Sequence, residues 1–335
     1  MNDMYNVSSS PHIRSSVTTR DIMLDVIIAM LPVSIIGIYN NGLRALLVIL
    51  STVVACLLTE FVYEKCMKKP VTTGDLSAVV TGMILALNMP ASIPLWMPIC
   101  GGIFAILVVK MLYGGLGMNF MNPALAGRVF LLICFAQQMN GFAVEKSSNL
   151  FMNGALAVDG VSGPTPLGLL KESGTTTNAL TLFLGNHAGT IGETSVIALL
   201  IGAAYLVAKK VISLRIPVAY IATFAIFFVL FGGQNSTDIN VILTQVLGGG
   251  LIFGAFFMAT DYVTSPITPM GQIIFGICLG IVTGVFRVFG PAAEGVSYAI
   301  IFCNLLVPLI EKVSMPAYFG KPSGNFLKKF KKGAN

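Results

Sequence analysis

One loop of this 335-residue chain carries the residue types best suited to covalent chemistry. In the run from Asp159 to Leu167, the hydroxyl of Thr165 lies between Pro164 and Pro166, six residues after the Asp159 carboxylate. Glycine and proline in such a run predict a rigid turn that presents this hydroxyl. A threonine held in this way can accept a modification, although a purely structural turn is the commoner meaning of such a run.

A second threonine-rich run follows, at Thr175, Thr176 and Thr177. It lacks an aspartate at the spacing that Asp159 has from Thr165. We interpret this run as a polar loop and not as a competing acceptor.

Polar residues also stand at the ends of apolar runs, where they can bind a ligand or cap a helix. Glu193 and Thr194 precede one apolar run, and a helix N-terminus there favours anions. Asn119 and Asn122 precede another, with Pro123 in the position that helix starts favour. For both pairs, ligand binding and simple capping remain open.

Acidic residues inside or beside apolar segments are candidates for an ion pathway, because a buried charge is costly unless it is paired or hydrated. Four qualify, although all stand near segment ends where water can solvate them: Asp25, Glu60, Asp75 and Glu311. Glu60 near Lys65, and Glu311 beside Lys312, can also be ordinary interfacial pairs. Asp261 belongs to a polar turn with Thr264 and Ser265 and can serve a ligand or only the backbone.

Metal chemistry has little support in the sequence. The six cysteines are scattered without a CxxC pair, and the two histidines, His12 and His187, lie in polar segments far apart. We therefore expect no metal site, no haem and no self-contained iron–sulfur cluster.

The composition indicates which elements position these residues. Hydrophobic residues make up 55% of the chain and charged residues 10%, a balance that excludes an ordinary soluble enzyme and a disordered protein. The net charge of +6 does not indicate a nucleic-acid partner, because Lys and Arg stand at the ends of apolar runs. We expect an all-α integral membrane protein.

About ten transmembrane segments are expected, five before the long polar loop and five after it. Two of them are interrupted: Leu76 to Leu87 ends at Asn88-Met89-Pro90, and Val241 to Thr260 contains Gly248-Gly249-Gly250. The other eight run approximately over 22–39, 43–63, 95–112, 123–138, 194–211, 216–231, 272–289 and 295–310.

The distribution of positive charges predicts the orientation. With a cytoplasmic N-terminus, sixteen Lys and Arg residues, among them Lys110 and Arg128, fall on the cytoplasmic side, and four, among them Arg287, fall outside. Both termini are then cytoplasmic. The predicted divisions are a cytoplasmic tail at 1–21, a first membrane repeat at 22–139, an extracytoplasmic loop at 140–193, a second repeat at 194–314 and a basic cytoplasmic tail at 315–335.

The two halves resemble each other weakly. Residues 112–115 and 122–132 align with 287–290 and 297–306, and a broken segment with a proline turn precedes each block, at 88–98 and 260–269. Because each half has an odd number of segments, the second copy must be inverted. Matching broken helices in inverted five-segment repeats point to a buried site.

Several blocks resemble one family, the B subunit of the sodium-pumping NADH:quinone oxidoreductase (Nqr) and the D subunit of the Rnf complex. The run containing Asp159, Ser162, Gly163 and Thr165 is similar to the family signature Asp-x-x-Ser/Thr-Gly-Ala-Thr, with Pro164 in place of the usual alanine. The resemblance extends over nearly the whole chain, through residues 119–128, 192–195, 258–261 and 264–266.

The resemblance implies two flavins. FMN would be esterified through its phosphate to Thr165, near Asp159, Ser162, Gly163, Glu193 and Thr194. A non-covalent riboflavin would lie near the cytoplasmic side, beside Asn119, Asn122 and Asp261. Pro164 stiffens the backbone before the acceptor, which can affect recognition by the flavin transferase.

The resemblance favours the D subunit of an Rnf-type ferredoxin:NAD⁺ oxidoreductase in the bacterial cytoplasmic membrane. It implies electron transfer coupled to Na⁺ or H⁺ movement, with other Rnf subunits, a flavin transferase and membrane lipids as partners, and no activity for the isolated subunit. The short N-terminal tail favours Rnf over the Nqr B subunit. A urea-channel-like solute channel shares the predicted architecture and would bind no flavin.

Overall fold

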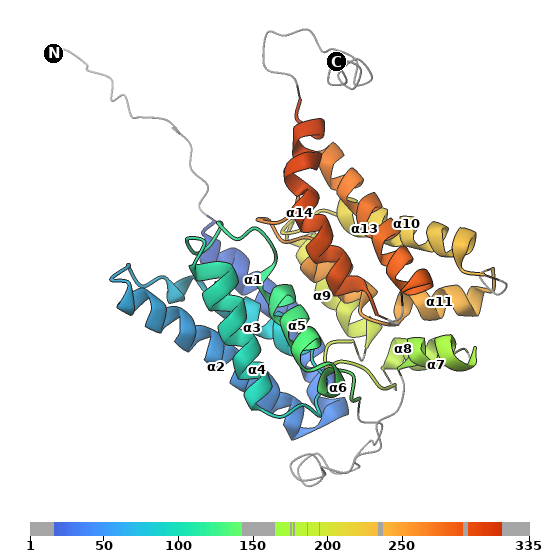
Figure 1. Ribbon diagram of the computed structural model, residues 1–335, viewed down its shortest axis with the longest axis horizontal. Coiled ribbons are helices and arrows are strands. Elements are labelled where there is room, and N and C mark those ends of the chain that lie inside the picture. Colours follow the sequence, from blue (N-terminus) through green and yellow to red (C-terminus); the bar gives the residue numbers. More distant parts are fainter. Residues whose placement is uncertain are drawn as a thin grey trace.

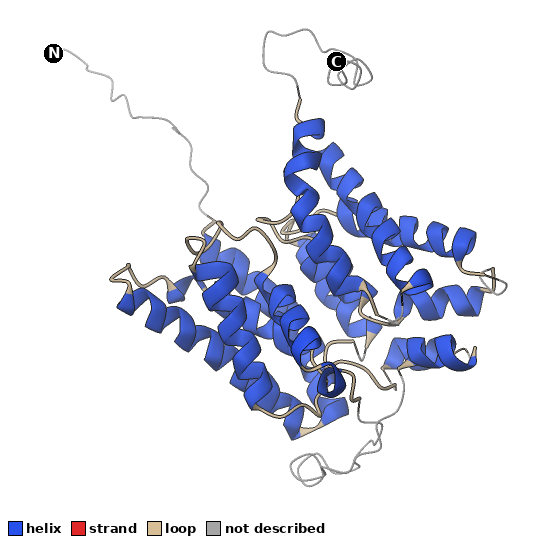
Figure 2. Cartoon of the chain, viewed as in Figure 1, coloured by secondary structure: helices blue, strands red, loops and turns tan. Residues whose placement is uncertain are grey.

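The computed structural model is helical throughout the residues that it describes, with no strand among them (Figure 2). These are residues 17–142, 165–174, 176, 178–185, 187–193, 195–233, 237–290 and 294–316. The predicted helical class is therefore confirmed for this part of the chain.

The first half contains two long helices followed by shorter ones. Their bounds are α1 Thr19–Asn41, α2 Leu43–Cys66, the 3₁₀ turn η1 Thr73–Asp75, α3 Ser77–Leu87, α4 Trp96–Ile103, the π-helical η2 Phe104–Met111, α5 Pro123–Cys134 and α6 Ala136–Met139. α4 continues into η2 without a break. The chain therefore ends this apolar segment in a π-helix, a form often found at functional positions.

The described part of the loop between the halves contains two short helices, α7 Pro166–Ser173 and α8 Ala179–Leu184. The described residues of the second half contain one broken segment and end in two long helices. It consists of α9 Val196–Ala208, α10 Arg215–Phe231, α11 Ile239–Leu247, α12 Leu251–Phe253, the π-helical η3 Gly254–Met258, α13 Pro269–Phe289 and α14 Val296–Ser314.

Helix starts follow the local sequence. Thr18 and Asp21 form a reciprocal capping box at the start of α1, and Asn122 caps α5 ahead of Pro123. Ser195 caps α9 by accepting from the Ala198 N–H. Capping by the sequence before α9 is thus confirmed, with Ser195 as the capping residue; Thr194 lies outside the described residues.

Length and composition separate the helices into three groups. Among the described residues, four helices (α1, α2, α13 and α14) are long and apolar enough to cross a membrane, and α11 with α12–η3 forms a fifth candidate bent by 55°. Five more apolar segments are shorter, at 10–17 residues. The ten predicted apolar segments thus all occur as helices, whereas their number of complete crossings and the inversion of the halves stay predictions.

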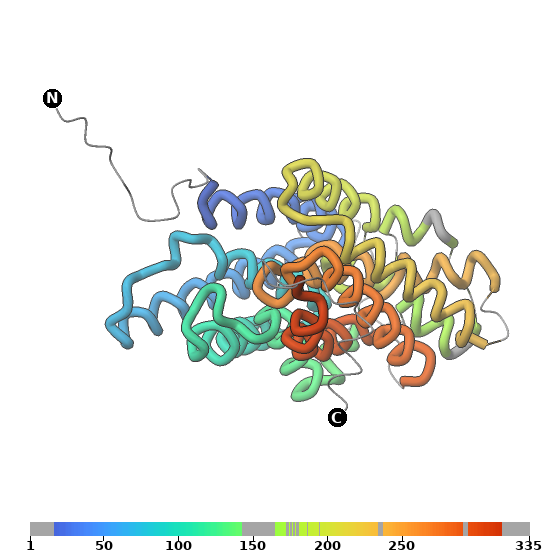
Figure 3. The backbone as a smooth tube through the Cα atoms, turned by 90° about the horizontal axis from the view of Figure 1, so that it is seen from above, coloured from blue at the N-terminus to red at the C-terminus, as the bar shows by residue number. Residues whose placement is uncertain are grey.

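The two halves lie side by side, the first in blue to green and the second in yellow to red (Figures 1 and 3). α1 packs against α9, and α5 packs against α14, so corresponding helices of the halves meet. Within the halves, α2 packs on α4 and α10 packs on α13. This arrangement places the two breaks, after α3 and between α11 and α12, near the junction of the halves.

Small residues allow the closest helix contact. On α13, Gly276, Gly280 and Gly284 recur every four residues and face α10. A Cβ added to Gly280 would lie 2.8 Å from the Phe224 backbone nitrogen, closer than two such atoms can approach. The glycine stripe therefore sets the distance between these helices, as small residues do in membrane bundles.

Candidate functional site

Thr165 lies at the start of α7. Its side-chain oxygen accepts a hydrogen bond from the Gly168 N–H at 3.2 Å, and Pro166 occupies the first helical position. The side chain is buried, at 9% exposure. The predicted hydroxyl thus stands at a helix N-terminus, where backbone N–H groups favour a phosphate. Asp159, Ser162 and Gly163 of the motif lie outside the described residues.

α7 docks on the break between α11 and α12. Gly249 and Gly250 have φ of +64° and +67°, a conformation that glycine tolerates best. A Cβ at Gly249 would lie 2.1 Å from Leu167 Cδ1, so the first turn of α7 contacts the bare backbone of the break. The helix that begins at Thr165 is therefore seated on the interrupted helix of the second half.

Arg287, on α13, closes this break. Its Nη2 donates to the carbonyl oxygens of Gly248 at 3.2 Å and Gly249 at 2.9 Å, and its Nη1 donates to the carbonyl of Gln245. Carbonyls at a helix end lack intrahelical partners, and a cation there interacts favourably with the helix dipole. Arg287 thus stabilises the C-terminal end of α11.

Arg128, on α5, is the second buried arginine of this region. Its Nη2 lies 3.0 Å from a carboxylate oxygen of Glu294, and its Nη1 donates to Asn88 Oδ1 at 2.8 Å and Ser297 Oγ at 3.0 Å. Side chains from both halves therefore meet at Arg128. We call Arg128, Glu193, Arg287 and Glu294 the outer cluster.

Glu193 completes the outer cluster. It is 5% exposed, and its Oε1 lies within 2.3 Å of the position that a Gly250 Cβ would occupy. Burial raises the pKa of Glu193 to about 7, helped by repulsion from Glu294 and opposed by Arg128 and Arg287. Glu193 therefore points toward the helix break and is not a dipole-compensating residue in the first turn of α9.

The outer region also has unused hydrogen-bonding capacity. Among the described residues, six buried side-chain polar atoms have no hydrogen-bond partner, and five of them lie in the outer cluster or in the loop that carries Glu193: Arg128 Nε, His187 Nδ1, Thr190 Oγ1, Glu193 Oε1 and Arg287 Nε. Buried polar atoms in proteins are nearly always paired. Unpaired atoms concentrated here fit a region that receives a polar ligand.

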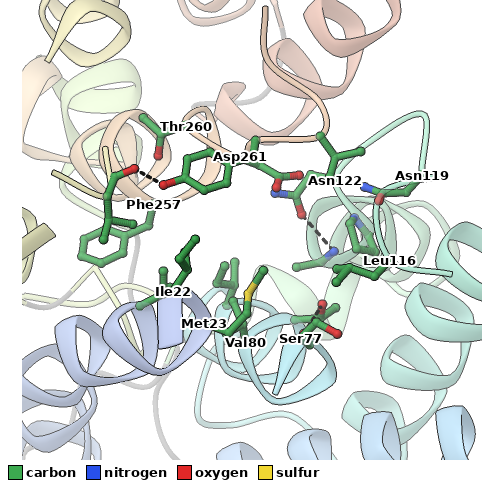
Figure 4. A pocket seen from close by; sticks show the side chains of 18 of the residues that line it. Ile22, Met23, Ser77, Val80, Leu116, Asn119, Asn122, Phe257, Thr260 and Asp261 are labelled. Atoms are coloured by element: carbon green, nitrogen blue, oxygen red, sulfur yellow. Dashed lines mark hydrogen bonds between the residues drawn. The ribbon is translucent and has the colours of Figure 1, made fainter. Parts of the chain in front are cut away.

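A pocket lies between the halves, with a cavity of about 210 Å³ (Figure 4). Asn119, Asn122 and Asp261, the three residues predicted to contact a second flavin, all line it. Most of the remaining lining is apolar, including Ile22 and Phe257. We call this cavity the inter-half pocket; an apolar cavity with a few convergent polar groups is the usual form of a cofactor site.

The polar residues of the inter-half pocket also serve the backbone. Asn122 accepts from the N–H groups of Ala124 and Leu125, so its predicted capping role is confirmed, and its amide donates to the Met258 carbonyl at 3.4 Å. The amide of Asn119 donates to the Met121 carbonyl at 3.1 Å.

Asp261 forms the predicted polar turn by accepting from Thr264 Oγ1 at 3.0 Å. Structural roles therefore exist for all three candidates, alongside their place in the pocket wall.

Two of the predicted ion-pathway acids belong to one network. Lys110 Nζ donates to Glu60 Oε1 at 2.7 Å and to Ser77 Oγ at 2.6 Å, and Ser77 Oγ donates to Asp75 Oδ1 at 2.6 Å. Glu60 is only 1% exposed, so our alternative of an interfacial pair with Lys65 is wrong. We call Glu60, Asp75, Ser77 and Lys110 the lysine network.

The other two acids lie elsewhere. Asp25 accepts from the Tyr205 hydroxyl at 2.7 Å and lies 3.6 Å from Lys209 Nζ, in a partly exposed position. Glu311 accepts from the Ile267 N–H at 3.3 Å. Both therefore have partners outside the lysine network. Within the described residues, no group of three His, Cys, Asp or Glu side chains is arranged to hold a metal ion.

Three basic residues require a correction to the charge count. Lys110 and Arg128 entered it as cytoplasmic and Arg287 as external, but all three are buried in the interior at 2%, 6% and 5% exposure. Without them the bias is fourteen against three, so the predicted orientation keeps its support.

These three residues and Glu294 are the site residues that sequence reasoning missed. Their signal was present, since an arginine or lysine inside an apolar run is functional by default in a membrane protein.

The chain matches the family model described as NQR2, RnfD, RnfE over residues 6–320. It is 44% identical to the D subunit of the Na⁺-translocating ferredoxin:NAD⁺ oxidoreductase complex of Acetobacterium woodii, over 96% of this chain and 97% of that protein. It is 39% identical to the D subunit of the proton-translocating ferredoxin:NAD⁺ oxidoreductase complex of Clostridium ljungdahlii, over 95% and 97%. Identity to the D subunit of the ion-translocating oxidoreductase complex of Actinobacillus succinogenes is 35%, over 95% and 98%.

Proposed function

Because this chain belongs to the NQR2, RnfD, RnfE family, we propose that it is the D-type membrane subunit of an ion-translocating ferredoxin:NAD⁺ oxidoreductase complex. The apolar helices and the family make it a multi-pass membrane protein. Its partners are the other subunits of such a complex and the lipids of the bacterial cytoplasmic membrane, with both termini in the cytoplasm. The isolated subunit has no activity of its own.

Thr165 is the proposed acceptor for FMN. Three observations support this assignment: the hydroxyl stands at the N-terminus of α7, α7 is seated on the broken helix, and the unpaired polar atoms of the outer cluster lie around that break. The phosphate would lie at the positive end of the α7 helix dipole. Bound flavin supplies electron transfer, and a flavin transferase is required for its attachment.

The inter-half pocket is the proposed site of a non-covalent riboflavin. Its wall offers amide groups from Asn119 and Asn122 and a carboxylate from Asp261 to the polar edge of such a ring, with apolar side chains for its faces. The proposed chemistry of this chain is to hold the two groups at fixed positions in one membrane subunit and to keep water from the pocket wall.

A polar connection joins the two sites. Arg128 of the outer cluster donates to Asn88, Asn88 contacts Met258 Sδ at 3.8 Å, and the Met258 carbonyl accepts from Asn122 in the inter-half pocket. Contacts between neighbouring residues therefore lead from the outer cluster to the inter-half pocket through the junction of the halves. This connection is the observation that most favours a two-site carrier over a pore.

Two alternatives remain distinct. The Nqr B subunit has the same motif, and the identities to Rnf-type D subunits favour Rnf. A solute channel would use the same helices without a flavin. The coupled ion is Na⁺ or H⁺, because the relatives named above include one translocator of each.

The decisive experiment is fluorescence of the denatured protein in a gel, after co-expression with a flavin transferase. Wild type is expected to fluoresce under ultraviolet light, and Thr165→Ala to be dark. Thr175→Ala, in the neighbouring threonine run, is the matched control and should fluoresce like wild type. A dark wild-type band would contradict the proposal and favour the channel.

A further inference from the structure

Lys110 holds a position that electron transfer alone does not explain. Its ammonium lies between the Glu60 carboxylate and the Ser77 hydroxyl, and all three side chains are at least 96% buried. Removing such a pair from water can cost more free energy than the attraction between its charges returns. Ionisable residues kept inside a membrane protein at this cost usually lie on the path of an ion or a substrate.

Negative groups outnumber this single cation. Glu60 Oε2 is buried without a hydrogen-bond partner, so half of the carboxylate is free to bind a further positive group. Asp75 lies one hydrogen bond away through Ser77, and Glu64 and Asp75 both repel Glu60 electrostatically. The ammonium therefore occupies a set of oxygen atoms of the type that hard cations prefer.

Lys110 and Ser77 also line the inter-half pocket, together with Asn119, Asn122 and Asp261. Figure 4 shows Ser77 at the edge of the same cavity as these polar groups. Lys110 belongs to the last turn of the π-helical η2, and a lysine side chain is a flexible stem with a compact charge. The ammonium can therefore reach both Glu60 and the inter-half pocket from the same backbone position.

We propose that Lys110 is a tethered cation that alternates between Glu60 and the inter-half pocket, and that its departure leaves a Na⁺-type monovalent cation site formed by Glu60 and Ser77. One carboxylate with a hydroxyl suits a single charge. An added negative charge in the pocket draws the ammonium toward it, and one cation then neutralises Glu60. The inference rests on the proposed function only for the source of that negative charge; the cation site itself does not require a flavin.

The test removes the tethered charge from the full-length chain in lipid nanodiscs, without added flavin. Lys110→Met is expected to unfold about 2–4 °C higher in NaCl than in choline chloride, because Na⁺ binds the folded state through the vacated oxygens. The double variant Lys110→Met/Glu60→Gln should lose this difference. Lys209→Met, which removes the exposed lysine beside Asp25, is the matched control and should show none.

Equilibrium binding of ²²Na⁺ provides the second readout. Lys110→Met should bind one Na⁺ per chain at least about tenfold more tightly than wild type, a difference that corresponds to about 1.4 kcal/mol. Lys110→Gln keeps a polar side chain near Ser77 and serves if the methionine variant does not fold. Equal Na⁺ binding by wild type and both variants would overturn the proposal.

Flavin extraction from the assembled complex separates this inference from the proposed function. Na⁺ binding by Lys110→Met in a protein whose pocket never retains riboflavin would support the cation site and overturn the assignment of the pocket. Riboflavin in the pocket with no Na⁺ site in either Lys110 variant would do the reverse.

Discussion

The outer cluster and the lysine network are two solutions to burying charge in one membrane protein. The outer cluster uses arginines, and its Arg287 is bound to backbone carbonyls of Gly248 and Gly249. The lysine network uses one ammonium, held by the side chains of Glu60 and Ser77. A guanidinium is a planar, rigid fork, whereas an ammonium is a compact charge on a flexible stem. The comparison indicates that the arginines of the outer cluster hold fixed positions, whereas the Lys110 ammonium of the lysine network is a movable charge.

The numbers of positive and negative groups also differ between the outer cluster and the lysine network. In the outer cluster, two arginines face two glutamates, and Arg128 also binds Asn88 and Ser297. In the lysine network, Lys110 alone faces Glu60 and Asp75, with Glu64 nearby. The outer cluster therefore has as many arginines as glutamates, whereas acidic groups outnumber the Lys110 ammonium, which leaves room for a second cation.

The largest effect is expected from Arg287→Met, which disrupts the outer cluster. The change leaves the carbonyls at the end of α11 without the Arg287 donors and Glu193 with Arg128 as its remaining nearby cation. Removing one partner from a buried charged group costs about 3–5 kcal/mol. We expect a large fall in the unfolding temperature and in the yield of folded protein. Arg215→Met is the matched control, since this exposed arginine contacts Gln272 at 3.4 Å and should leave stability near wild type. Equal stability of the two variants would contradict the claim that Arg287 stabilises the outer cluster.

A smaller effect is expected from protonation of Glu193. The folded protein holds this proton to about pH 7, while the unfolded chain releases it near pH 4.5. The unfolded state therefore binds fewer protons between these values, and stability falls as pH rises through this window. Unfolding temperatures from pH 5 to 8 should decline more for wild type than for Glu193→Gln, which cannot lose the proton.

Glu311→Gln, at a carboxylate that accepts from the Ile267 N–H, is the control and should keep the wild-type slope. A wild-type slope in Glu193→Gln would show that the raised pKa belongs to another group.

The smallest effect is expected at Asp25. Like Glu60, it lies near a lysine, but the pair with Lys209 is partly exposed. Asp25→Asn weakens the contact with Lys209 at 3.6 Å and keeps a hydrogen-bond acceptor for the Tyr205 hydroxyl. Partly exposed pairs contribute about 0–1 kcal/mol, so the unfolding temperature should stay within a few degrees of wild type. A large loss, comparable to that of Arg287→Met, would show that burial does not separate the two kinds of pair.

Helix positions were largely readable from the sequence because apolar runs and caps are local signals. Asn122 ahead of Pro123, and the three glycines at 248–250, marked a helix start and a helix break that the structure confirms. The lengths of the shorter helices were less readable. The apolar run from 123 onward continues past Cys134, but α5 ends there and α6 follows. Phe135 leaves the helical conformation, with φ of −135° and ψ of 50°, and hydropathy does not encode such a change.

The site was only half readable for a different reason. Asn119, Asn122 and Asp261 were predicted to lie together and do line one pocket. Arg128, Arg287 and Lys110 were counted as topology signals, because a positive charge near a segment end has two meanings that only tertiary contacts separate. Glu294 stands alone among uncharged residues, three positions after Pro291 in the sequence, and its partner Arg128 lies in the other half of the chain. No local sequence pattern predicts a contact between residues so far apart.

The seating of Leu167 on Gly249 has a consequence for the order of biogenesis. With α7 docked, Thr165 is buried, and its hydroxyl oxygen already accepts a hydrogen bond from the Gly168 N–H. On the proposed function, an enzyme that esterifies this hydroxyl must meet the loop before docking or after it lifts away. Docking then becomes a late step that follows maturation, and a chain that docks too early is closed to its own modifying enzyme.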